Sequence, residues 1–399
     1  MAIGIIAEYN PFHFGHAHQI SELKKRFDEE IVVVMSGSFT QRGSPAILDK
    51  WTRAKLAILG GSDIIFELPF VFAVRSAENF AVGGINLLKS LGVVDKLAFG
   101  AEIDDLERLK AAARVFDGKN FKKKLLEQMT QGKSYAAAVT GILSAEIGLE
   151  EEILRQPNTI LAIEYLRALP QEISPILIKR IGAGYDNLTL QGKFSSASAI
   201  RAALYEKNPP WEKISECVSA ETLKTLRAEK ISGLVDENFL FRPLLTKILT
   251  SRVDELKKIY GMTEGLEFRL QNAAAAKNFP ELIKILVGRR YPASRIRRLL
   301  LYFLLNVTAA EISELDAANC ARILGFSERG RKLLKKISEP VVTKLTKHLN
   351  RRDIYERRRK LEPYQKILLF DVLATDLREI LFETPRSPKK DFYTPINFL

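Results

Sequence analysis

Residues 3–19, IGIIAEYNPFHFGHAHQ, contain the local signals that set the fold of this chain. The apolar run at residues 3–7 predicts a buried strand, and the helical spacing of apolar residues over 16–27 predicts a helix. Pro11 disfavours the helical conformation at Asn10, so the chain must turn between the two elements. Gly15 leaves out a side chain where backbone and ligand would come close. Such a strand–turn–helix unit points free N–H groups and a helix dipole at an anion, most naturally a phosphate.

The same alternation of apolar runs and helical periodicity continues through the first half of the chain. Strands separated by helices of this length predict an α/β fold, with right-handed βαβ units and a Rossmann-like parallel sheet covered on both faces. After residue 204 strand-like patterns become rare, which predicts a mostly α-helical C-terminal region and a loosely packed tail over 384–399. We therefore expect domains at 1–204 and 205–399. The expected strands are 3–7, 31–35, 63–67, 97–100 and 176–181, and the expected helices are 16–27, 48–59, 77–91, 106–116 and 158–169.

The composition is that of a soluble globular protein long enough to bury a sizeable core. Of the 399 residues, 46% are hydrophobic and 27% are charged. No run approaches about 20 apolar residues, so no transmembrane helix is expected, and the N-terminus lacks the features of a signal peptide. Cys217 and Cys320 are the only cysteines, which excludes a four-cysteine zinc site and suits a reduced compartment. We expect a cytoplasmic protein.

The net positive charge of the chain lies in its second half. Residues 1–200 contain 23 basic and 23 acidic residues, so residues 201–399 carry the entire net charge of +13. Residues 281–360 alone contain 20 basic and 8 acidic residues. This asymmetry indicates a neutral module joined to one that binds a polyanion, the alternative being a chance scatter of surface charges.

Two basic clusters account for much of this charge. The first combines an aromatic ring, Tyr291, with Arg289, Arg290, Arg295, Arg297 and Arg298, and the second covers residues 351–360. Guanidinium groups beside an aromatic ring suit phosphate contacts and stacking on an exposed nucleotide. For either cluster alone, a solvated helix face with internal ion pairs is the alternative. Together they predict RNA binding. An anionic membrane is disfavoured because no run pairs a basic face with exposed Trp or Phe.

Three of the four histidines fall within residues 13–18, directly after the first expected strand. His13 and His16, three residues apart, could donate hydrogen bonds to phosphate oxygens as charge builds on a departing pyrophosphate. A histidine pair on a surface turn is the alternative, and a zinc site lacks further ligands in the sequence. His18 lies off that helix face and is more typical of packing or solvent exposure.

A second pattern typical of anion binding lies at the end of the first half of the chain. Residues 194–201, FSSASAIR, place hydroxyl and N–H groups at a helix start, with an arginine one turn later. The pair of patterns resembles the HxGH nucleotidyltransferase superfamily, whose second element is often Ile-Ser-Ser-Thr-x-Ile-Arg. This chain differs in having Ala197-Ser198 where many relatives have Thr.

A longer series of motifs narrows the resemblance to the bacterial tRNA(Met) cytidine acetate ligase family. In order, the motifs cover residues 7–16, 35–43, 49–54, 66–69, 99–102, 156–158, 180–185 and 194–201, with a looser match at 290–298. Members of that family activate acetate with ATP, giving acetyl-AMP and pyrophosphate. They then pass the acetyl group to the exocyclic amine of the wobble cytidine in elongator tRNA(Met). The mixed anhydride is needed because a free carboxylate has no adequate leaving group.

The resemblance implies specific roles, with ATP, accompanied by Mg²⁺, as cosubstrate and acetate and tRNA as partners. The implied catalytic residues are His13 and His16, and no metal-ligating residue is expected in the chain. The implied ATP-binding residues are Ala7, Glu8, Tyr9, Asn10, Pro11, Phe12, Phe14, Gly15, Ala17, His18, Gln19, Gly100, Asn158, Arg180, Ile181, Ser195, Ser196, Ser198 and Arg201. The implied tRNA-binding residues are Arg289, Arg290, Arg295, Arg297 and Arg298. Two alternatives stay open for the loop residues Gln41, Arg42, Gly43 and Lys50: they contact substrate, or they belong to a solvated loop.

Three points stay open in the sequence. Gly100, Asn158 and Arg180 could equally be a strand-end turn, a helix cap and a strand-edge charge. No general base is identified, although Glu8 and Glu67 both end a strand on the expected side of the sheet. An adenylyltransferase that makes a small nucleotide cofactor and a non-catalytic RNA-binding scaffold are the rival functions.

Overall fold

The computed structural model describes residues 1–399 except 182–187, 264, 317–318 and 356–359. Its centre is an eight-stranded sheet of order β5-β4-β1-β2-β3-β6-β7, with β8 pairing to β6. The strands from β1 to β5 run parallel, and β6 is antiparallel to β3. Their bounds are β1 Ala2–Ala7, β2 Glu30–Ser36, β3 Ile64–Leu68, β4 Val94–Ala101, β5 Ser174–Lys179, β6 Ala321–Phe326, β7 Val341–Val342 and β8 Asn397–Phe398.

Helices cover both faces of the sheet, as the alternation of apolar residues requires. Ile3 and Ile5 of β1 pack on one face with apolar residues of α1, α2 and α10–α12, while Ile6 belongs to the core on the other face with α4 and α9. This confirms the predicted α/β fold. The helices on the sheet are α1 Phe14–Phe27, α2 Lys50–Leu59, α3 Phe70–Ala73, α4 Ala77–Ser90, α9 Pro157–Ala168, α10 Ala197–Tyr205, α11 Trp211–Ser215 and α12 Ala220–Ile231.

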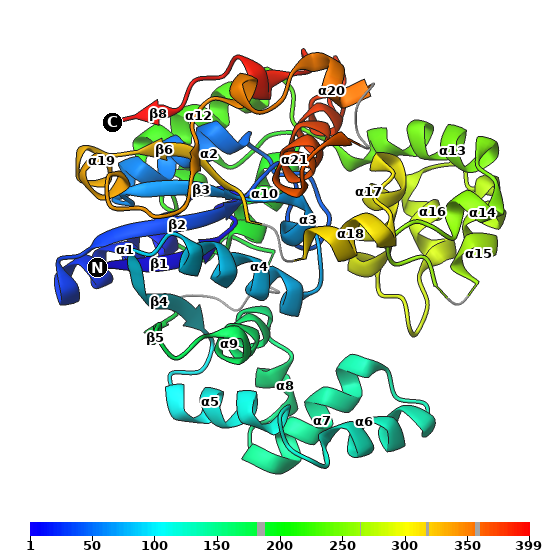
Figure 1. The fold of residues 1–399 in the computed structure, drawn as a ribbon, viewed down its shortest axis with the longest axis horizontal. Helices are drawn as coiled ribbons and strands as arrows, with labels where there is room; N and C mark the ends of the chain where they lie inside the picture. The colour runs from blue at the N-terminus through cyan, green and yellow to red at the C-terminus, as the bar shows by residue number, and fades with distance from the viewer. Residues whose placement is uncertain (182–187, 264, 317–318, 356–359) are drawn as a thin grey trace.

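Two helical lobes project from this core (Figure 1). One follows β4 and consists of α5 Leu106–Val115, α6 Phe121–Thr130, α7 Tyr135–Ile147 and α8 Glu151–Leu154. The other consists of η1 Glu237–Leu240, α13 Phe241–Thr250, α14 Val253–Leu256, α15 Leu266–Asn272, η2 Ala273–Ala275, α16 Phe279–Leu286, α17 Ala293–Leu305 and α18 Ala309–Leu315. Of the described helices, none is long and apolar enough to cross a membrane.

The last third of the chain returns to the sheet, and here one expectation needs correction. Residues 205–399 are mostly helical, as expected, and they add the short strands β6–β8, of which β6 covers the edge of β3 that would otherwise be open to solvent. Part of the expected loose tail is packed: Asp391 is buried and pairs with Lys50 and Arg322. The remaining elements are α19 Glu328–Leu334, η3 Leu345–Lys347, α20 Arg351–Tyr355, α21 Pro363–Glu379 and η5 Lys390–Phe392.

Candidate functional site

A cavity of about 1140 Å³ lies over the carboxyl ends of the parallel strands. It sits where the chain order of the strands reverses around β1, the usual ligand site of open parallel sheets. The N-terminal ends of five helices line it: α1, α4, α9, α10 and α17. Each end points the positive end of a helix dipole at the cavity, so the cavity favours a polyanion.

His13 and His16 form the cap of α1 at the centre of this cavity. The Nδ1 atom of His13 accepts a hydrogen bond from Gly15 N–H at 2.9 Å, and Nδ1 of His16 accepts from His13 N–H at 3.4 Å. The two rings lie 3.9 Å apart between centroids. Because both Nδ1 atoms are acceptors, each neutral ring carries its proton on Nε2. The pair therefore offers two Nε2–H donors.

Burial and neighbouring cations keep both rings neutral. Burial lowers the pKa of His13 to about 3, helped by the positive charges of Arg180 and Arg201. Burial also lowers the pKa of His16 well below its usual value, with smaller contributions from His13 and Arg180. Neutral imidazoles can donate to phosphate oxygens, and a bound triphosphate would in turn favour the charged imidazolium form.

The turn that carries the histidines is held by groups from distant parts of the chain. A Cβ atom at Gly15 would lie 2.7 Å from Cε1 of His13, so a side chain there would displace the ring. Asn10 uses its Oδ1 to accept from Ile47 N–H at 2.8 Å, and its carbonyl accepts from Arg201 Nη1 at 2.5 Å. The first and second sequence motifs are thus joined by a direct hydrogen bond.

The three serines of the second motif differ in position. Ser196 caps α10 by accepting from Ala199 N–H at 3.1 Å, and Ser198 accepts from Arg201 Nη2 at 3.1 Å. Both line the cavity. Ser195 is buried outside the lining, where its hydroxyl donates to the carbonyl of Gly192 at 2.8 Å. The structure thus brings two of the three hydroxyls to the cavity.

The opposite side of the cavity is formed by the ends of β4 and β5. Gly100, Asn158, Arg180 and Ile181 all line it. A Cβ atom at Gly100 would lie 3.1 Å from Cγ of Arg180, a tighter approach than side chains usually make. The Asn158 amide donates to Glu102 at 2.6 Å. Glu102 therefore orients Asn158, a role that only the three-dimensional pairing reveals.

The structure divides the residues named from the sequence into two sets. Those that line the cavity are Ala7, Glu8, Tyr9, Asn10, His13, Gly15, His16, His18, Gln19, Gly100, Asn158, Arg180, Ile181, Ser196, Ser198, Arg201, Arg297 and Arg298. Those outside the lining are Pro11, Phe12, Phe14, Ala17, Ser195, Arg289, Arg290 and Arg295. Residues 182–185 of one motif and 356–359 of the second basic cluster lie outside the described residues.

The arginines around α17 have different surroundings. Arg289 and Arg290 are exposed, and Arg295 lies over the ring of Tyr291, 4.5 Å from its centroid. Arg297 pairs with Glu237 at 2.8 Å, and Arg298 donates to the carbonyl of Gln41 at 3.3 Å. The sequence groups these arginines on one surface, whereas in the structure the last two, Arg297 and Arg298, line the cavity.

Several lining residues carry no signal in the sequence. Ser76 caps α4, and Phe80 and Tyr165 form apolar walls of the cavity. Gln41 and Arg42, which the sequence left open, also line it, whereas Lys50 is buried against Glu67 at 2.8 Å. Within the described part of the chain, no group of three or more His, Cys, Asp or Glu side chains is placed to hold a metal ion.

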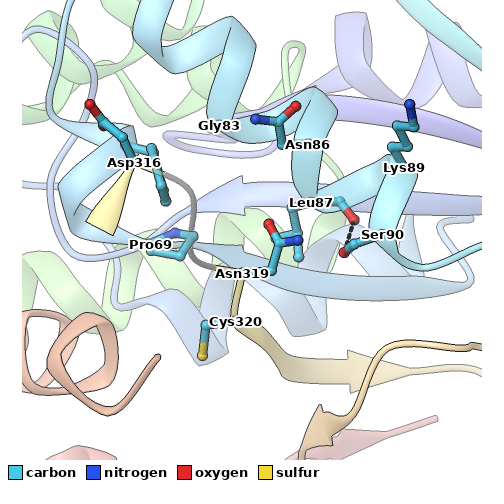
Figure 2. Close-up of a pocket in the computed structure, with 10 residues that line it drawn as sticks. Pro69, Gly83, Asn86, Leu87, Lys89, Ser90, Asp316, Asn319 and Cys320 are labelled. Atoms are coloured by element: carbon cyan, nitrogen blue, oxygen red, sulfur yellow. Dashed lines mark hydrogen bonds between the residues drawn. The ribbon is translucent and has the colours of Figure 1, made fainter. Parts of the chain in front are cut away.

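A second cavity, of about 340 Å³, lies between α4 and the segment that precedes β6 (Figure 2). Its lining includes Asn86 and Lys89 of α4, together with Asp316, Asn319 and Cys320. Its lining contains none of the catalytic, ATP-binding or tRNA-binding residues implied by the sequence and none of the five helix ends. The larger cavity is therefore the candidate active site.

Comparisons with known proteins agree with this geometry. The model of the HIGH Nucleotidyl Transferase family matches residues 1–391. The chain is 38% identical to the tRNA(Met) cytidine acetate ligase of Caldanaerobacter subterraneus subsp. tengcongensis and 34% identical to that of Halothermothrix orenii, covering 99% of this chain in both and 99% and 98% of those proteins. The crystal structure of Thermotoga maritima TmcAL bound with alpha-thio ATP is 31% identical, has a TM-score of 0.86, and is matched over 100% of both chains. The chain therefore belongs to the tRNA(Met) cytidine acetate ligase family of HIGH nucleotidyl transferases.

Proposed function

We propose that this protein activates acetate with ATP and acetylates the exocyclic amine of the wobble cytidine of elongator tRNA(Met). The observation that carries the proposal is a single cavity that combines two Nε2–H donors with five helix N-termini. Such a cavity suits a triphosphate and the charge that develops when pyrophosphate leaves. The relatives named as ligases, and the ATP analogue bound to Thermotoga maritima TmcAL, support the same assignment.

In the first step an acetate oxygen attacks the α-phosphorus of ATP. The new bond from acetate oxygen to phosphorus forms as the bond to the β-phosphate oxygen breaks, giving acetyl-AMP and pyrophosphate. His13 and His16 donate from Nε2 to phosphate oxygens, and Arg201 with Ser198 adds charge and hydrogen bonding at the start of α10. Mg²⁺ would enter with the triphosphate and neutralise part of its charge.

The nucleoside is assigned to the β4–β5 side of the cavity. Gly100 permits close approach there, and Asn158, oriented by Glu102, offers a polar contact to ribose or adenine. The base or phosphates would meet Arg180 and the backbone of Ile181. We further propose that residues 1–204 supply most of the ATP site and 205–399 most of the tRNA site. The exposed Arg289 and Arg290, with Arg295 beside Tyr291, would contact RNA in the cytoplasm.

One assay separates this function from its rivals. The protein is incubated with ATP, Mg²⁺ and labelled acetate, with unmodified elongator tRNA(Met) or a matched tRNA that carries uridine at the wobble position. We expect acetate-dependent pyrophosphate release, and label in N4-acetylcytidine only with the cytidine-containing tRNA. Adenylylation of a small nucleotide without acetate would favour a cofactor-making enzyme, and tight tRNA binding without either product would favour a scaffold.

A further inference from the structure

Glu8 is the only acidic residue among the described residues that line the cavity. It directly follows β1, the middle one of the five parallel strands β5-β4-β1-β2-β3, and precedes the His13 turn by five residues. The other strand-end carboxylate left open by the sequence, Glu67, is buried in ion pairs with Lys50 at 2.8 Å and Arg322 at 3.4 Å. The structure therefore separates two carboxylates that the sequence could not.

Apart from His18, the other titratable groups in the described lining are poorly suited to accept a proton. The Nδ1 atoms of His13 and His16 already accept backbone N–H groups, which leaves their Nε2 atoms protonated. Burial raises the pKa of Tyr9 and of Tyr165, so both phenols keep their protons. His18 packs edge to face against Phe194, on the α10 side of the cavity. The remaining titratable side chains are lysine and arginine.

Glu8 is held on the side of the cavity that faces the basic helical region. Its carbonyl accepts from Arg53 Nη1 at 2.5 Å, and its Oε1 accepts from Gln41 N–H at 2.7 Å. The carbonyl of Gln41 is held in turn by Arg298, and its side-chain amide donates to the carbonyl of Arg75 at 2.7 Å. Oε1 is thus fixed by a loop that α17 supports.

The strand order places Glu8 between the two substrates. The proposed nucleoside side lies over β4 and β5, whereas the loop after β2 and the first turn of α17 lie across β1 on the other side. An RNA bound to the exposed arginines before α17 would enter from that second side. Glu8 and Tyr165 both line the cavity.

We propose that Glu8 is the catalytic proton acceptor for acetyl transfer, an inference that rests on the function proposed above. The cytosine amine attacks the carbonyl carbon of acetyl-AMP, and a C–N bond forms. One N–H proton passes from the amine to the Glu8 carboxylate. The bond from carbonyl carbon to phosphate oxygen then breaks, and AMP leaves with that electron pair. A positioned base matters here because the cytosine amine is a weak nucleophile until it loses a proton.

The test compares the two half-reactions in Glu8→Gln, whose amide oxygen can still accept from Gln41 N–H but cannot take up a proton. Acetate-dependent exchange of labelled pyrophosphate into ATP reports acetyl-AMP formation without tRNA. Rapid mixing of enzyme, ATP and labelled acetate with tRNA reports transfer. Glu22→Gln, on the outer part of α1, is the matched carboxylate control. Glu8→Asp, which keeps the base on a shorter side chain, tests rescue, and thermal unfolding checks folding.

We expect Glu8→Gln to slow transfer by about 100-fold or more beyond its effect on exchange, because exchange depends on Glu8 only through nucleotide binding whereas transfer also needs its proton-accepting oxygen. Glu8→Asp should recover part of the transfer rate. Transfer at the wild-type rate in Glu8→Gln, or equal loss of transfer and exchange, would overturn the role of Glu8. If the wild-type protein itself shows no acetate-dependent exchange, the proposed function fails, and that result is distinct from failure of the Glu8 assignment.

Discussion

Adding one methyl group at Gly15 tests whether the turn after β1 positions His13 for chemistry. The new Cβ would lie 2.7 Å from Cε1 and 3.0 Å from Nδ1 of His13, so the ring must move and lose its 2.9 Å bond from Gly15 N–H. Loss of such a cap costs about 0.5–2 kcal/mol. Alanine in place of glycine near a helix start returns up to about 1 kcal/mol. The free energy of unfolding should therefore fall by no more than about 2 kcal/mol.

Activity should respond far more strongly than stability. Displacing one donor by about 1 Å, or removing it, typically costs about 100-fold or more in rate. We expect Gly15→Ala to lower kcat/KM for acetate-dependent pyrophosphate exchange by about that factor, with a melting temperature within a few degrees of wild type. The matched control is Gly141→Ala in α7, where the nearest atom to a new Cβ is the end of the Gln128 side chain at 3.3 Å. Wild-type exchange in Gly15→Ala would refute the proposed role of the turn.

Three further predictions concern protonation, RNA and the C-terminus. Below about pH 6.5 the histidines of the unfolded chain bind protons, whereas His13 and His16 of the folded chain stay neutral, so the free energy of unfolding should fall by up to about 1.4 kcal/mol per pH unit per ring. In thermal unfolding, bound ATP should reduce that fall. A stability that does not change with pH would contradict the neutral pair. Arg290→Ala should weaken tRNA binding, measured by filter binding, and reduce the slope of log affinity against log salt by about 1, without affecting exchange. Arg298→Ala should slow acetyl transfer, measured by quench kinetics, because Arg298 holds the carbonyl of Gln41. Slower transfer in Arg290→Ala with weaker tRNA binding in Arg298→Ala would show that the two roles are misassigned. Asp391→Asn should cost about 3–5 kcal/mol in urea unfolding, because Lys50 and Arg322 lose a shared buried carboxylate, and a cost below about 1 kcal/mol would show that the cluster is solvated.

The parallel half of the fold was predictable because its signals are local. Apolar runs bounded by Pro11 and Gly15 define β1 and α1 without reference to the rest of the chain. Strand β6 is different. Its sequence, ARILGF, is a short apolar run among helices, and its pairing depends on the open edge of β3, more than 250 residues earlier. The buried position of Asp391 likewise depends on partners that the local sequence does not identify.

The residues of the candidate site likewise differ in whether local sequence signals predict them. His13 and His16 could be found from the sequence because strand, turn and helix follow one another directly. Ser76 and Phe80 reach the cavity from α4 and Tyr165 reaches it from α9, helices that are far apart in the sequence, so no spacing in the sequence predicts their meeting. The density of basic residues around Arg297 and Arg298 predicts an exposed surface. In the structure both residues line the cavity and bind partners from distant segments, Glu237 and Gln41.

A crystal structure with a non-hydrolysable ATP analogue tests the central claim most directly. We predict that the triphosphate lies over the turn between β1 and α1, with phosphate oxygens within about 3.2 Å of Nε2 of His13 and His16. The adenosine should lie on the side of Gly100 and Asn158. A nucleotide bound elsewhere, with the turn empty at saturating ligand, would contradict the account.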